Sequence, residues 1–102
     1  MFNDRYVREV LKELRITDAD INAEIENVMK SPCGILCLTR TSFEEGIRRT
    51  VDPMVKQKLR TAALELIMER VFGSNYENIL EDWLIPDIEM YILEKMEDYL
   101  RN

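Results

Sequence analysis

Residues 52–73 read DPMVKQKLRTAALELIMERVFG, and this stretch decides the fold. Asp52 supplies a capping carboxylate, and Pro53 stands in the first helical position, where its missing N–H group costs nothing. Apolar residues then recur at spacings of three and four, which places them on one face of a helix: Val55, Leu59, Ala62, Ala63 and Leu66. Gly73 can end the helix by adopting a positive φ angle. The stretch therefore predicts the longest helix of the chain.

The sequence that follows continues the helical pattern. Residues 74–77 (SNYE) have the composition of a capping box and predict a helix that runs through Trp83 and Leu84. Pro86 is expected to interrupt or kink this pattern, because proline has no N–H group to donate to the preceding turn. A last helix is expected from there to about Leu100.

The sequence before the long helix also carries helical signals. Apolar residues with a spacing of three and four predict a first helix near residues 4–15. Thr17 or Asp18 is expected to cap a second helix, which ends before Pro32.

The segment between the second helix and the long helix is harder to assign. Residues 35–38 (ILCL) form an apolar run that is typical of either a strand or a buried helical turn. We favour a turn, because no second strong strand candidate exists to pair with it. A short helix is then expected to begin at Thr41 or Ser42, with Glu44 or Glu45 at the capping-box position.

These elements define the expected fold class. We predict an all-α protein: a compact single-domain bundle of five or six helices over residues 1–102, with orthogonal as well as antiparallel packing. A chain of 102 residues is too short to build two independent hydrophobic cores.

The residue inventory limits the function classes. The chain has 20 acidic and 14 basic residues, and its formal net charge of −6 argues against a generic polyanion binder. It contains no histidine, the commonest general base, and no glycine-rich phosphate loop, so we expect neither an enzyme nor a cofactor. Cys33 and Cys37 are expected to be small core residues rather than a zinc site or a redox pair.

Hydropathy and the N-terminal residues bear on location. The longest stretch without a charge covers residues 31–39, whereas a membrane span needs roughly 20 apolar residues. The first residues are charged from Asp4 and lack the apolar segment of a secretory signal. We expect an intracellular protein, cytoplasmic by default, that has no membrane contact.

The last helix carries more apolar surface than one neighbouring helix can cover. Its apolar residues span roughly 200° of the helix circumference, about twice the usual stripe. Either this helix fills the centre of the domain, or part of it contacts a partner such as a second copy of the chain. We favour the interface, with a homodimer as its simplest form, and expect three aromatic anchors: Trp83, Tyr91 and Tyr99.

Acidic residues surround this apolar stripe. Residues 77–102 hold eight acidic and two basic side chains, of which Glu94, Glu97 and Asp98 are expected to steer a partner. The sequence thus favours a small non-enzymatic protein–protein interaction module, such as a regulator, adaptor or inhibitor of a larger assembly.

The alternative is a nucleic-acid-binding regulator that uses the basic segment 40–60. Its candidate contacts are Arg40, Arg48, Arg49, Lys56, Lys58 and Arg60. Because Val55 and Leu59 should face the core, the neighbouring cations would spread around the helix rather than line one groove. Such a surface supports contact with phosphates without base recognition.

Overall fold

The longest helix forms where residues 52–73 predict it. In the computed structural model, which describes residues 4–34 and 41–101, α4 spans Pro53–Phe72. The Asp52 side chain accepts a hydrogen bond from the Met54 N–H group at 2.9 Å and so caps the first turn. The helix ends at Gly73, whose φ of +99° is open to glycine and strained for other residues. The start and end signals of α4 are therefore confirmed.

Over the described ranges, the chain is an all-α globule of six helices, five of them seven residues or longer, without a strand. The other five are α1 (Asp4–Glu13), α2 (Asp18–Lys30), α3 (Phe43–Arg49), α5 (Tyr76–Ile79) and α6 (Ile85–Arg101). Thr17 caps α2 in a complete capping box with Asp20, and Ser42 caps α3. The predicted fold class is thus confirmed.

An isolated antiparallel β-bridge joins the two ends of the segment between α2 and α3. Pro32 pairs with Ser42, and the Cys33 N–H group donates to the Thr41 carbonyl at 2.9 Å. The apolar run for which we predicted a turn, residues 35–38, lies outside the described residues.

The sequence after Gly73 departs from the prediction. Asn75 is the N-cap of α5, and its side chain makes no capping hydrogen bond, so the expected capping box does not form. The helix is a single turn that ends at Ile79 instead of continuing through Leu84. Pro86 lies in the first turn of α6, where helical N–H groups have no intrahelical acceptor, and this position explains why it begins a helix rather than kinking one.

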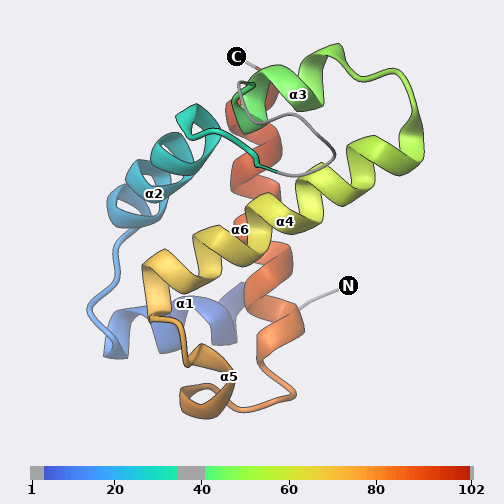
Figure 1. Ribbon diagram of the computed structural model, residues 1–102. Coiled ribbons are helices and arrows are strands. Elements are labelled where there is room, and N and C mark those ends of the chain that lie inside the picture. Colours follow the sequence, from blue (N-terminus) through green and yellow to red (C-terminus); the bar gives the residue numbers. More distant parts are fainter. Residues whose placement is uncertain (1–3, 35–40, 102) are drawn as a thin grey trace.

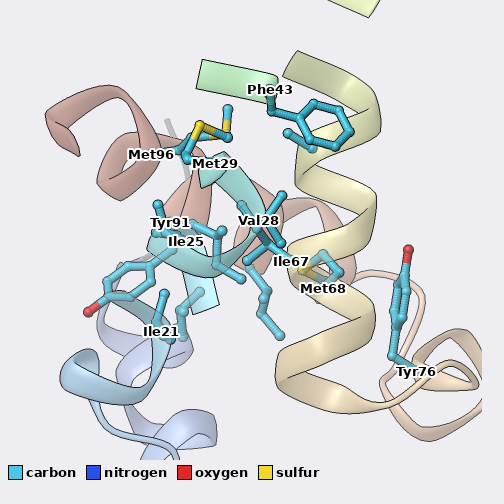
Figure 2. Close-up of a cluster of buried hydrophobic side chains, with 14 of the residues drawn as sticks. Ile21, Ile25, Val28, Met29, Phe43, Ile67, Met68, Tyr76, Tyr91 and Met96 are labelled. Carbon is cyan, nitrogen blue, oxygen red and sulfur yellow. The ribbon is translucent and has the colours of Figure 1, made fainter. Parts of the chain in front are cut away.

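The helices pack around the crossing of α4 and α6 (Figure 1). Helix α2 packs against both of them, α3 contacts α2 and α4, α1 covers α6, and α5 contacts α4. Figure 2 shows how α2, α4 and α6 direct apolar side chains into one cluster, among them Ile25, Ile67 and Met96. Burial of such side chains is the main force that holds the helices together.

Helix α6 is the centre of this core. Ile88, Ile92 and Met96 are fully buried, and Tyr91 is only 5% exposed. Helices α1, α2 and α4 supply the several neighbours that its broad apolar stripe requires. The central position of α6 in the domain is therefore confirmed. Leu93, Tyr99 and Leu100 of the same stripe are only partly buried, and the expected contact of α6 with a partner stays a prediction.

Candidate interaction surface

An aromatic pair stands out on the surface. Tyr6 of α1 and Trp83, in the turn before α6, are 54% and 59% exposed. Their rings meet edge to face, with centroids 6.3 Å apart. Large aromatic side chains are usually buried, so an exposed pair of this size is typical of a contact site.

The local structure holds Trp83 in place while leaving it exposed. On either side of it, Leu80 and Leu84 are buried and anchor the turn to the core. The Leu84 N–H group donates to the Glu81 carbonyl at 2.9 Å, and the indole N–H group of Trp83 donates to the Glu81 carboxylate. On α1, Val7 is fully buried next to Tyr6. Both aromatic residues therefore belong to segments, α1 and the turn before α6, that buried side chains fix to the core.

The segment that carries Trp83 is acidic. Residues 77–94 contain six acidic residues and no basic one. Within the described part of the chain, Glu77, Glu81, Asp82 and Asp87 enter no ion pair. Burial, followed by the charges of Glu65 and Glu77, raises the pKa of Glu89. We call Tyr6, Glu81, Asp82 and Trp83 the Trp83 surface.

Tyr91, predicted as an aromatic anchor, is instead a core residue. Its hydroxyl group donates to Asp18 Oδ1 at 2.7 Å, and Lys95 Nζ lies 5.0 Å from the centre of its ring. Burial, followed by the hydrogen bond to Asp18, raises the pKa of Tyr91 to about 12. Tyr91 is only 5% exposed and is therefore not the protruding anchor that the sequence predicts.

The remaining predicted partner residues lie along α6, away from Trp83. Tyr99 is partly buried, and a hydrogen bond with Glu44 raises its pKa to about 12. Glu97 forms an ion pair with Arg60, in which Glu97 Oε1 lies 2.7 Å from Arg60 Nε. The Nε–H group makes no hydrogen bond to the described residues, whereas Arg60 Nη2 donates to Glu97 Oε2 at 3.4 Å. Asp98 pairs with Arg101, and Glu94 is exposed. Because Trp83 and Asp98 are separated by about 20 Å of helix, the structure does not bring the predicted set together.

The basic segment is partly neutralised by the chain itself. Arg48, Arg49 and Arg60 form ion pairs with Glu44, Glu45 and Glu97, respectively. Lys56 is half-buried and Lys58 exposed, while Arg40 lies outside the described residues. These ion pairs reduce the positive charge available to a phosphate backbone. They do not test nucleic-acid binding, which stays a prediction.

Two features were missed at the level of sequence. Tyr6 was not singled out, because its partner Trp83 is distant in the chain and only the docking of α1 on α6 brings them together. The second feature is a basic edge formed by Arg8 and Lys12 of α1 and by Arg15 in the turn after it. Their spacing of four and three residues is readable in the sequence and could have revealed that edge.

Neither a metal site nor a membrane-spanning helix occurs among the described residues. Within residues 4–34 and 41–101, no three Cys, Asp or Glu side chains come together to bind a metal ion. Cys33 is buried, and Cys37 lies outside those residues. None of the helices described combines the length and the apolar character needed to cross a bilayer.

Comparison with known proteins returns no relative: no family model, no curated protein and no solved structure matches the chain. The burial, contacts and charges of the described residues are therefore the basis for a function.

Proposed function

We propose that the protein is a small non-enzymatic interaction module that binds a basic partner protein through the Trp83 surface. The observation that carries the proposal is the exposed Tyr6–Trp83 pair in a chain whose other tyrosines near α6 are buried or half-buried. This proposal keeps the function class favoured by the sequence and moves the contact from the body of α6 to the turn before it.

The aromatic pair supports binding energetically. Tryptophan and tyrosine side chains account for a large share of interface hot spots, each worth at least about 2 kcal/mol when truncated. Trp83 and Tyr6 already pack edge to face, so little side-chain entropy remains to be lost on binding. The pair is therefore suited to anchor a partner.

The charge of the surface indicates the chemistry of the partner. Glu81 and Asp82 are exposed beside Trp83, and no basic residue occurs from residue 77 to residue 94. A symmetric dimer through this surface would place the two acidic clusters against each other, which is unfavourable. A lysine- or arginine-rich partner would be attracted to the same cluster and would bind less tightly at high salt.

Affinity capture with a matched pair of variants tests the proposal. The tagged protein, Trp83→Ala and Met54→Ala are each used to capture proteins from the source cells at low and high salt. Met54 is 71% exposed on α4 and provides a control for the loss of an exposed apolar side chain elsewhere. Captured proteins are quantified by mass spectrometry.

We expect a basic protein that the wild type and Met54→Ala capture, that Trp83→Ala loses, and that high salt releases. A captured set that is the same for all three proteins would overturn the proposal. A dimer of the isolated chain in light scattering that Trp83→Ala dissociates would also overturn it, because a second copy would then occupy the surface.

A further inference from the structure

A pocket of about 330 Å³ lies beside the other edge of α1. Its apolar wall is formed by Leu11, Ile16 and the ring of Tyr91, which bring together α1, the turn after α1, and α6. Figure 2 shows that the hydroxyl end of Tyr91 points away from the hydrophobic cluster. The volume is near the lower end of the range for small-molecule sites.

The rim of this pocket is basic. Arg8, Lys12 and Arg15 line it from α1 and its C-terminal turn. Arg8 pairs with Asp4 at 2.9 Å, whereas no ion pair involves Lys12 or Arg15 within the ranges that the structure describes. The basic rim is thus only partly compensated.

Asp18 is the acidic residue on the pocket wall, and its charge is already compensated. One carboxylate oxygen accepts the Tyr91 hydroxyl hydrogen bond at 2.7 Å, and the other lies 3.4 Å from Lys95 Nζ. Lys12 and Arg15 therefore leave two positive charges at the pocket of a chain whose net charge is −6.

Arg15 occupies a backbone position that favours glycine. Its φ is +61°, in the left-handed region. The Ile16 N–H group donates to the Leu11 carbonyl at 2.9 Å, and the Arg15 N–H group donates to the Lys12 carbonyl at 3.1 Å. These two bonds define a Schellman motif with Arg15 in the usual glycine position. The chain thus carries a cationic side chain at the pocket rim at a conformational cost.

We propose that this pocket binds a small organic anion that has an apolar body. Lys12 and Arg15 hold its carboxylate or phosphate oxygens by charge-assisted hydrogen bonds, and the apolar body packs on Leu11, Ile16 and the Tyr91 ring. The site is independent of the Trp83 surface: Tyr6 and the basic residues occupy opposite edges of α1, on either side of the buried Val7 and Leu11.

Titration with model anions, followed by amide chemical shifts of the labelled protein, tests the proposal. The probes are phenyl phosphate, benzoate and inorganic phosphate, with neutral benzyl alcohol as the control. We expect saturable shifts at residues 8–18 with at least one aromatic anion, and weaker binding of both inorganic phosphate and benzyl alcohol. The better of the two aromatic anions identifies the head group.

Variants assign the binding to the rim. Arg15→Asn keeps a residue that tolerates a left-handed backbone, removes the charge, and should weaken binding about tenfold, as should Lys12→Gln. Arg15→Lys retains the charge and should bind within about threefold of the wild type. Lys58→Gln removes an exposed charge of α4 and should leave affinity unchanged.

Equal affinity in Arg15→Asn, Lys12→Gln and the wild type would overturn the proposal. Shifts that follow every exposed cation, Lys58 included, would show an adventitious ion only and would also overturn it. The absence of saturable shifts with all four probes would do the same. Circular dichroism confirms that each variant keeps its helices, so that a loss of affinity reports on the pocket.

Discussion

Helices α1 and α6 use their apolar residues in opposite ways. Helix α6 has the broad apolar stripe, yet α1, α2 and α4 cover it and leave Ile88, Ile92 and Met96 without exposure. Helix α1 has a narrow stripe, and both proposed binding features lie along its edges. In this fold the breadth of an apolar stripe reflects the number of neighbouring helices within the chain, and the proposed surface contacts involve the helix with the narrower stripe.

Ile92→Ala should have the largest effect, because it opens a cavity where α6 is fully enclosed. Truncation of a buried isoleucine costs about 2–5 kcal/mol, through lost burial and the remaining cavity. Since small domains are stable by only about 5–15 kcal/mol, urea denaturation should show a much lower midpoint.

Met90→Ala is the control on the same helix. Met90 is 45% exposed, and its truncation should change the free energy of unfolding by less than about 1 kcal/mol. Similar losses for Ile92→Ala and Met90→Ala would contradict the central position of α6.

Tyr91→Phe should have an intermediate effect, because it removes the hydroxyl group that ties α6 to the start of α2. Loss of the hydrogen bond to the Asp18 carboxylate should lower the free energy of unfolding by about 1 kcal/mol near neutral pH. This is less than for a buried hydrogen bond to a charged group, because the Asp18 side chain is 57% exposed. Urea denaturation of both proteins measures this difference.

The pH dependence identifies the hydrogen bond as the cause. The Tyr91 hydroxyl, more than any other group, lowers the pKa of Asp18 below its ordinary value of 3.8. This stabilisation is complete above the unfolded pKa and is lost as pH falls through the lower folded pKa. The difference between wild type and Tyr91→Phe should therefore shrink below about pH 4. A difference that stays constant into acid would indicate altered packing instead.

The alkaline limb gives a second check on the same variant. Because the pKa of Tyr91 is raised from 10.0 to about 12, its contribution is complete below pH 10 and is lost as pH rises through 12. Tyr91→Phe has no such group, and its stability should fall less steeply over this interval. Tyr99, which has a similarly raised pKa, remains in both proteins.

Local signals in the sequence predict much of the helical fold. The cap at Asp52 and the stop at Gly73 act within a few residues, so α4 could be placed without knowledge of the rest. The helix expected through Leu84 was wrong because the composition of residues 74–77 does not produce the capping hydrogen bond, and the buried Leu80 and Leu84 anchor a turn instead.

The candidate sites are harder to predict from the sequence, since they depend on contacts between residues that are distant in the chain. A broad apolar stripe has the same pattern whether its neighbours come from the chain or from a partner, which is why α6 was assigned to an interface. The hydrogen bond between Tyr91 and Asp18 spans 73 positions and removes an expected anchor from the surface. Only the three basic residues of α1 and the turn after it could have been grouped from their spacing.

Arg15→Gly should have the smallest effect on stability, and the effect should be favourable. Glycine relieves the strain of a φ of +61°, whereas its greater freedom in the unfolded chain opposes folding. The net result is an increase in the free energy of unfolding of up to about 1 kcal/mol. Thermal unfolding measures it, with Arg8→Gly as the control, because glycine within α1 should lower the free energy of unfolding by about 1 kcal/mol.

If Arg15 serves the pocket, the same Arg15→Gly variant should be at least as stable as the wild type while binding aromatic anions about tenfold more weakly. The opposite signs matter, because a residue whose role is only structural would not lose affinity as the fold gains stability. A less stable Arg15→Gly would show that the arginine side chain holds the end of α1 in place, and the cost of its backbone conformation would then have a structural explanation.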